Sequence, residues 1–340
     1  YKIYWEDTKM EFSATAGTAG GSLKALFEVR DGDNLENFKG KVTKADAYSL
    51  TVENTSIDNI KSLNLPDKDG KITVNNITYS YDSWEAQVDA QGNIKSVTFA
   101  LSRDKAIADP DKAVAEGYLL NAGSAINARG IPYYMTQLNE FVRNFSEMFN
   151  QIESKGQNLN GDTPPTFFEA ITSTAKVYDF SESAAYSKLP DGQTATINSS
   201  SNTYYRMTAA NFSVNKDVMN DVSLFATATD YVKTDSCDIV DELKKLQSEK
   251  TVYRGDKAES FLETIISNVS VDTEKAETYN KLYSNLEQTI ANQRTSVSGV
   301  DEDEEALNLV KFQNAYNMAS KIISVMNQML DKLINDTGVA

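Results

Sequence analysis

The sequence predicts an α+β multi-domain protein, in which a helical bundle or coiled-coil rod segment carries two mainly β modules. The chain has 340 residues, more than one average domain needs. Apolar residues recur at heptad spacing in 132–152 and 309–333, which is typical of packed helices. Between 34 and 101, apolar and polar residues alternate as in half-buried strands.

Composition and charge limit the classes of partner. Hydrophobic residues make up 40% and charged residues 24% of the chain, as in soluble folded proteins. The formal net charge of −16 argues against nucleic acid and anionic lipid, because an acidic surface repels both. No apolar run reaches the roughly 18 residues that a membrane span needs, so we expect no membrane insertion.

Missing residue types limit the chemistry. The sequence contains no His, which removes histidine-based catalysis and histidine-containing zinc sites. Cys237 is the single cysteine, so an internal disulfide and a cysteine-cluster metal site are excluded. The segment 67–70 does not continue into a calcium-binding loop, and we interpret it as a turn. We expect no catalytic, cofactor-binding or metal site, and no enzymatic activity.

Residues 1–33 are predicted to form a strand and a short helix that join the rod segment. Apolar Tyr1 and Ile3 alternate along the strand, and glycines break it further on. Ser22 is placed to cap the helix, which we expect to end near Arg30.

Residues 34–110 are predicted to form a small β module, inserted in the rod. Val74 ends one alternating run and Ile77 begins the next, with Asn75 and Asn76 between them. A two-residue Asn loop predicts a hairpin, because Asn tolerates positive φ.

Residues 161–236 are predicted to form a second β module. This segment is polar and rich in Ser, Thr, Asn and Tyr. It contains short alternating runs, such as 212–214, and turn clusters, such as 198–202.

Residues 111–160 are predicted to contain one rod helix. Pro132 suits a first helical turn, where its missing N–H costs little, and Gly156 suits the end of the helix. Its apolar residues form a heptad seam: Tyr134, Leu138, Phe141, Phe145, Met148 and Ile152.

Residues 237–300 are predicted to form rod helices. One apolar stripe runs from Ala258 to Val269 and another from Ala276 to Ile290, which we interpret as two separate helices. Gly299 is expected to separate them from the last helix.

Residues 301–340 are predicted to form a terminal helix that starts at Asp301, with Glu304 placed as in a capping box. Its first apolar seam consists of Leu309, Phe312, Tyr316, Ala319, Ile323, Met326, Leu330 and Leu333. A second seam beside it consists of Ala315, Met318, Ile322, Val325 and Met329.

Two adjacent seams predict a helix that buries about half of its circumference. The cover could come from an ordinary bundle core of the same chain or from neighbouring subunits, and the pattern alone leaves both open. The position near the end of the chain favours an assembly surface, because few later residues are left to cover the helix.

Several motifs resemble the family of bacterial flagellar hook-associated protein 1, the hook–filament junction proteins. In and before the terminal helix, the residues that resemble the family are 298–300, 303–305, 312–316, 321–324 and 329–334. Earlier in the chain they are 20–31, 132–152 and 158–161. In many members the helices at 20–31 and 132–152 lie closer in sequence, so the module between them is a departure from the family.

The resemblance implies an extracellular structural subunit of the flagellum at the hook–filament junction, exported by the type III apparatus without a cleavable signal peptide. It implies that 301–340 is the axial assembly helix and that its two seams bind the partners. These partners would be the hook protein, the second junction protein and further copies of the chain. An export chaperone would bind the same helix. The resemblance also implies that the chain lacks the family's N-terminal portion.

Two other functions stay open. Hook and rod proteins of the flagellum share a looser version of the terminal helix. An extracellular enzyme or glycan-binding module on a helical stalk would be indicated by aromatic residues clustered in a pocket of either β module. Catalytic carboxylate pairs are usually distant along a sequence, and nothing in this one points to such a pair.

Overall fold

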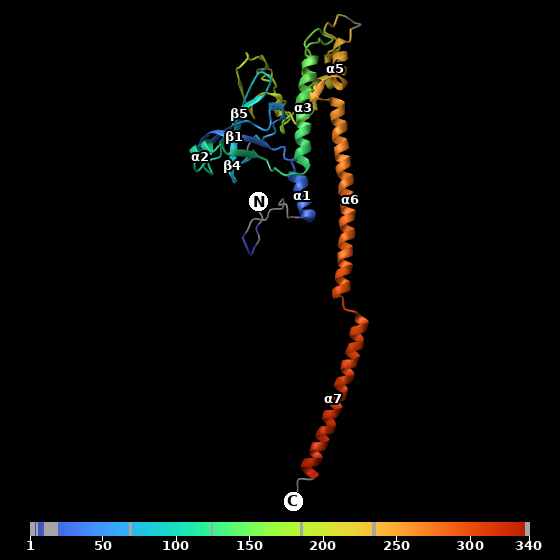
Figure 1. Cartoon of the computed structure of the whole chain (residues 1–340). Helices are drawn as coiled ribbons and strands as arrows, with labels where there is room; N and C mark the ends of the chain where they lie inside the picture. The colour runs from blue at the N-terminus through green and yellow to red at the C-terminus, as the bar shows by residue number, and fades with distance from the viewer. Residues whose placement is uncertain are drawn as a thin grey trace. The chain divides into compact units, whose positions relative to one another are not determined.

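The computed structural model describes residues 4, 6–9, 20–67, 70–123, 125–183, 186–232 and 236–336. The chain forms two compact units, 1–266 and 267–340, and its secondary structure confirms the α+β class (Figure 1). Most of the strand predicted before residue 17 lies outside the described residues. None of the described helices is long and apolar enough to cross a membrane.

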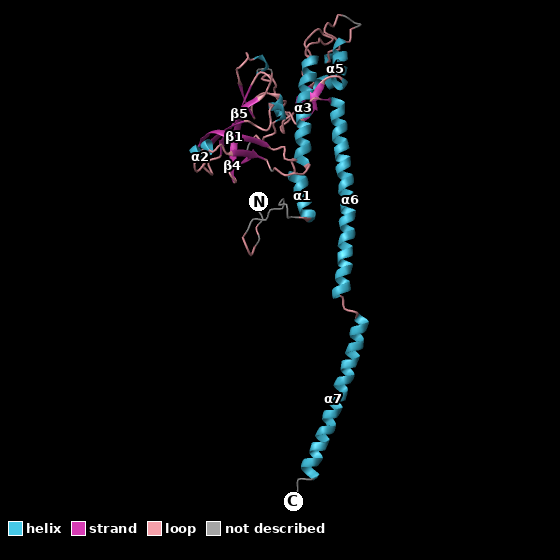
Figure 2. Ribbon diagram, viewed as in Figure 1, coloured by secondary structure: helices cyan, strands magenta, loops and turns pink. Residues whose placement is uncertain are grey.

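One antiparallel sheet organises the first unit (Figure 2). Its strands are β1 (Phe38–Asp46), β2 (Ser49–Glu53), β3 (Gly70–Val74), β4 (Ile77–Val88), β5 (Ile94–Leu101), β6 (Leu119–Ala122) and β8 (Ala195–Asn198). Their order is β3-β6-β1-β2-β5-β4-β8, and β3 also pairs with β4. The long β4 therefore closes the first six strands into a barrel-like ring and pairs with β8 through its second half.

The alternation in the sequence places one face of each strand in the core. Leu50 and Val52 of β2 are completely buried, as is Trp84 of β4, whose ring lies 4.9 Å from that of Tyr205. The predicted Asn75–Asn76 hairpin is confirmed: both residues have positive φ, 46° and 62°, between the paired Val74 and Ile77.

The sheet crosses both module boundaries that the sequence predicted. Strand β6 lies beyond residue 110 and pairs with β1 and β3, and β8 comes from the segment predicted as a separate module. Strands of four residues are too short to show a clear alternation. Between β5 and β6, α2 (Pro110–Ala115) packs on β1 and is capped by Asp109.

The rest of 161–236 contains short elements. They are β7 (Phe168–Ala170), β9 (Phe212–Val214), α4 (Lys216–Asn220) and the 3-10 turns η2 (Tyr186–Lys188), η3 (Tyr204–Arg206) and η4 (Val222–Leu224). Strands β7 and β9 pair with each other, so the strand predicted at 212–214 is confirmed. A further turn, η1 (Ile60–Ser62), lies in the sheet region.

Helices α1 (Gly21–Asp31) and α3 (Ile131–Glu153) follow the sequence closely. Pro132 lies in the first turn of α3, as predicted. Helix α1 begins at Gly21 after an extended Gly20, so the prediction that Ser22 is its cap was wrong. Gly21 has a φ of 83°, which glycine adopts at no steric cost, so the chain enters the helix two residues earlier than a Ser22 cap would place it.

The segment 237–300 differs from the prediction in two ways. Helix α5 (Asp238–Ser248) is followed by a hairpin, β10 (Thr251–Tyr253) and β11 (Asp256–Lys257), whose turn residues Arg254 and Gly255 have φ of 42° and 95°. The two predicted helices then form one helix of 41 residues, α6 (Ala258–Ser298). No Gly or Pro interrupts it between the two apolar stripes.

The heptad seam of α3 belongs to an intrachain core. Its partly buried Phe141, Phe145 and Met148 and its buried Ile152 pack with residues of α5 and the hairpin. The ring of Phe141 lies 4.9 Å from that of Phe261 at the start of α6. Helix α3 therefore finds its cover within the first unit.

A buried arginine joins α3 to the sheet region. The guanidinium of Arg143 donates hydrogen bonds to the main-chain carbonyls of Lys61, Leu63 and Met207, at 2.7 to 3.1 Å. It also lies over the ring of Tyr205, 4.5 Å from the centroid. Because the arginine is 3% exposed, this one side chain fixes α3 against η1 and η3 at once.

A second charged group ties the hairpin to α3. Arg254 pairs with the buried Glu140 of α3 at 3.2 Å and with Glu36 at 3.3 Å. Glu140 is 3% exposed, so loss of the arginine would leave a buried carboxylate unpaired.

One buried carboxyl at the end of α3 has no such partner. Glu153 is 1% exposed, and neither of its carboxylate oxygens has a hydrogen bond of normal geometry among the described residues. Burial raises the pKa of Glu153 from 4.5 to about 7, and the main-chain N–H of Ala226 opposes this only in part. The folded chain therefore holds the proton more tightly than the unfolded chain does.

Stability is expected to fall as pH rises from 4.5 to about 7, because the folded state must then bury a charge. In Glu153→Gln this fall should be absent, and the melting temperature at pH 8 should exceed that of the unmodified chain by a few degrees. Thermal melts at pH 5 and pH 8 measure the effect, with the exposed Glu85→Gln as the matched control. Equal pH dependence in the unmodified chain and Glu153→Gln would contradict this account.

Candidate functional site

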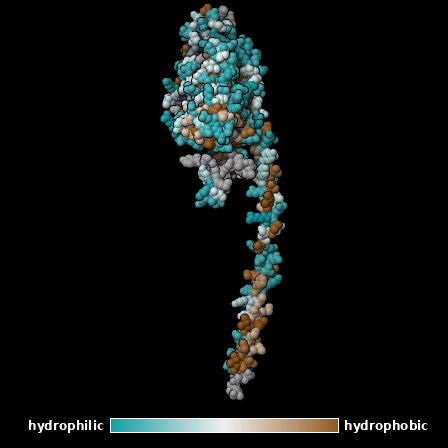
Figure 3. Space-filling model, turned by 60° about the vertical axis from the view of Figure 1, so that its left-hand side comes forward, coloured by the Kyte–Doolittle hydropathy of each residue, from teal (hydrophilic) through white to brown (hydrophobic). Residues whose placement is uncertain are grey.

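Helix α7 (Glu302–Asp336) carries both predicted seams, and none of its 35 residues is buried. The exposed fractions of its large apolar side chains range from 49% at Leu330 to 75% at Tyr316. Figure 3 shows hydrophobic side chains gathered along this helix. The exposed seam residues are Leu309, Phe312, Ala315, Tyr316, Met318, Ala319, Ile322, Ile323, Val325, Met326, Met329, Leu330 and Leu333.

The rest of the helix surface is polar with few charges. Between 307 and 334, the charged residues are Lys311, Lys321, Asp331 and Lys332. Asn, Gln and Ser fill most of the remaining positions. Uncharged amides and hydroxyls are easier to bury beside other helices than carboxylates and ammonium groups are.

The start of α7 is fixed locally. The carboxylate Oδ1 of Asp301 accepts hydrogen bonds from the main-chain N–H groups of Asp303, at 3.0 Å, and Glu304, at 3.3 Å. This confirms the predicted N-cap. The acids at 302–305 lie in the first turn, where the helix dipole favours negative charge.

Helix α6 has an exposed apolar stripe of its own in the second unit. Tyr279, Leu282, Tyr283, Leu286 and Ile290 are each at least half exposed, and the two tyrosine rings lie 6.4 Å apart. Exposed apolar stripes on two successive helices are more than a monomeric soluble protein normally presents to water.

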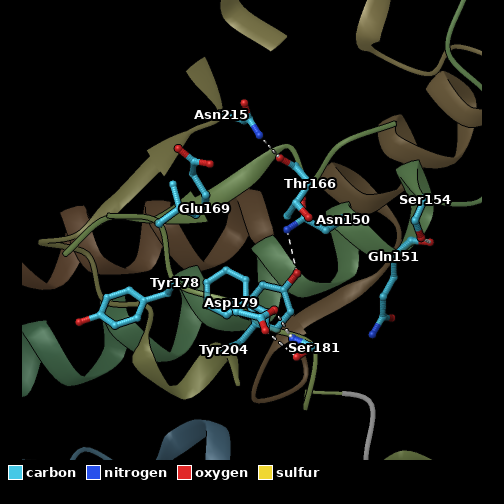
Figure 4. Close-up of a pocket in the computed structure, with 12 residues that line it drawn as sticks. Asn150, Gln151, Ser154, Thr166, Glu169, Tyr178, Asp179, Ser181, Tyr204 and Asn215 are labelled. Atoms are coloured by element: carbon cyan, nitrogen blue, oxygen red, sulfur yellow. Dashed lines mark hydrogen bonds between the residues drawn. The ribbon is translucent and has the colours of Figure 1, made fainter. Parts of the chain in front are cut away.

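The first unit contains a cleft that bears on the enzyme or glycan-binding alternative (Figure 4). Its volume is about 460 Å³, and aromatic residues Tyr178, Phe180 and Tyr204 contribute to its lining. Phe180 stacks on Tyr204 at 4.3 Å, and the guanidinium of Arg206 lies 4.2 Å from the centre of the Tyr178 ring. The rings thus serve the chain's own packing.

The described residues contain no group of three or more side chains suited to hold a metal ion. Cys237 is exposed at the start of α5.

Three functional or structural residues were not predicted from the sequence: the buried polar residues Arg143 and Glu153 of α3, and the cleft residue Glu169. A heptad pattern predicts that the polar residues of a helix face solvent. Nothing in the sequence distinguishes the polar residues that other segments of the chain bury.

Two comparisons with known proteins concern these same segments. Residues 291–336 match the family described as flagellar basal body rod FlgEFG protein C-terminal, which covers the end of α6 and all of α7. The chain is also similar to the flagellar hook-associated protein 1 of Bacillus subtilis (strain 168), with 21% identity over 341 residues. This similarity covers 98% of the chain and 56% of the relative, so the chain spans little more than half of that protein's length.

These findings confirm the resemblance to flagellar hook-associated proteins. The similarity also extends beyond the motif stretches recognised in the sequence, because it runs through the sheet and the segment between α3 and α5.

The cap at Asp301 gives a direct test of how α7 begins. Asp301→Ala is expected to destabilise the first turn by about 1 kcal/mol, because two main-chain N–H groups lose their acceptor. Hydrogen exchange at the amides of 303–305 should become faster, while Asp331→Ala, far from the helix start, should leave those amides unchanged. Unchanged exchange in Asp301→Ala would show that the cap does not hold the turn.

Proposed function

We propose that this chain is a structural subunit of the bacterial flagellum at the hook–filament junction, and that it assembles through the two seams of α7. The observation that carries the proposal is an exposed, two-seam apolar helix that matches the flagellar rod C-terminal family. The similarity to hook-associated protein 1 over 98% of the chain supports the junction over other positions in the axial structure.

The energetics fit an assembly element. Full burial of a Leu-, Ile- or Met-sized side chain is worth roughly 1.5–3 kcal/mol, and the cost of association is on the order of 4–15 kcal/mol. Burial of one seam therefore roughly offsets that cost, and the second seam supplies the surplus. Docking as a coiled coil uses the 3- and 4-residue spacing, because each apolar side chain then enters a hole on the partner helix.

The same surface suggests the partners. Neighbouring axial proteins, namely the hook protein, the second junction protein and further copies of this chain, would cover the seams after assembly. Before assembly, an export chaperone would cover them and keep the helix soluble during type III export without a cleavable signal. In this scheme the protein acts outside the cell through its shape and contacts and carries out no chemistry.

A hook or rod protein is the second candidate, since the family that matches 291–336 is described by rod proteins. The motifs at 20–31 and 132–152 favour the junction protein, and both segments are helices here, α1 and α3. The rings in the cleft of the first unit pack against one another and against Arg206, which weakens the glycan-binding alternative.

A charge placed in the seam tests the assembly surface. Ile323→Asp or Met326→Asp is expected to abolish incorporation into the hook–filament junction, because the carboxylate would be buried without a partner. The sheet should stay folded, as circular dichroism and the melting temperature would report.

Asn327→Asp is the matched control, because it adds the same charge on the polar face and should assemble normally. Incorporation of Ile323→Asp at the level of Asn327→Asp would refute the proposed assembly surface.

A further inference from the structure

The cleft of Figure 4 lies between the last turns of α3 and the segment that follows it. Asn150 and Gln151 come from α3, Ser154 caps the end of that helix, Glu169 comes from β7, and the loop 177–181 forms another side. Its volume of about 460 Å³ lies in the range of small-molecule sites. The proposed assembly surface lies in the second unit, so this cleft is independent of it.

Polar side chains that line the cleft are held by the chain itself. The amide of Asn150 donates to the carbonyl of Phe168 and to the hydroxyl of Tyr204, both at 2.8 Å. The carboxylate of Asp179 accepts from the main-chain N–H of Ser181 at 2.9 Å and from its hydroxyl at 2.8 Å. These side chains are thereby fixed in place before any ligand arrives.

The carboxylate of Glu169 is not held in this way. Its residue is 6% exposed, yet its carboxylate lines the cleft and projects toward the side on which Asn215 lies (Figure 4). No hydrogen bond or ion pair to this carboxylate is present among the described residues. Burial of the side chain destabilises its charged form and raises its pKa, so a cationic group in the cleft, where the carboxylate lies, would stabilise that form.

The surrounding charges favour a cation over a neutral ligand. The described lining contains two carboxylates, Glu169 and Asp179, and neither Lys nor Arg. Burial and the nearby Asp217 raise the pKa of Glu169, and Lys216 opposes this shift. The face of the Tyr178 ring is already covered by the guanidinium of Arg206, 4.2 Å from the ring centre, and is not open to a sugar. The stacked Phe180 and Tyr204 rings leave less flat surface for a sugar.

We propose that this cleft binds a primary alkylammonium group, with Glu169 as the carboxylate that pairs with it. The ammonium group would belong to a free diamine or to a lysine side chain, which share this chemistry. The asparagine, serine and threonine groups around the carboxylate would accept or orient the remaining N–H donors.

Calorimetric titration of the full chain with 1,5-diaminopentane tests the proposal, and 1,5-pentanediol is the uncharged probe of the same length. The diamine should bind and the diol should not. Nα-acetyl-lysine amide is a third probe. If it binds more tightly than the diamine, the source is a protein side chain, and the reverse order indicates a free diamine.

Glu169→Gln is expected to weaken diamine binding by about tenfold or more, because the charge-assisted contact is lost. The exposed Glu53→Gln should bind like the unmodified chain. Equal binding of diamine and diol by the unmodified chain would overturn the proposal without relying on any variant. Undiminished diamine binding by a folded Glu169→Gln would overturn it as well.

Discussion

The two apolar seams of α7 are exposed to water, and the proposed function depends on this exposure. A helix of 35 residues is about 50 Å long, and this one has no buried residue along its length. Most helices in proteins draw their stability from a packed apolar face rather than from propensity. We therefore expect other helices to cover α7 when the protein functions, and the proposed function depends on which helices these are.

Helix α3 shows the same pattern in the opposite environment. Phe141 and Phe145 repeat at the spacing of Phe312 and Tyr316, yet the former pair packs against α5 and the start of α6. An apolar seam in the sequence indicates that one face of a helix is buried by other residues. It does not identify whether those residues belong to the same chain or to a partner. The folded structure separates the two cases, because it covers α3 and leaves α7 exposed.

This contrast explains how much of the molecule could be predicted. Local chemistry predicted the start of α3 at Pro132, the Asn75–Asn76 hairpin and the cap at Asp301, because neighbouring residues determine each of them. The strands β6 and β8 were missed, since they are defined by partners far along the chain. Arg143 was missed for the same reason: its carbonyl partners come from 61–63 and from Met207.

Two arginines, the buried Arg143 and the more exposed Arg254, connect the segments of the first unit. Arg143 fixes α3 to the sheet region, and Arg254 joins the hairpin to both α3 and Glu36. Each arginine bonds to segments distant in sequence, so the sheet, α3 and the hairpin are held as one body.

The most direct test of the central claim is to remove the terminal helix. A chain that ends at Val300 would be compared with the 340-residue chain for binding to hook and junction proteins and to the proposed export chaperone. The shortened chain is expected to lose all of this binding while the melting transition of the first unit stays unchanged. Retained binding, or unfolding of the first unit, would contradict the assignment of α7 as the assembly element.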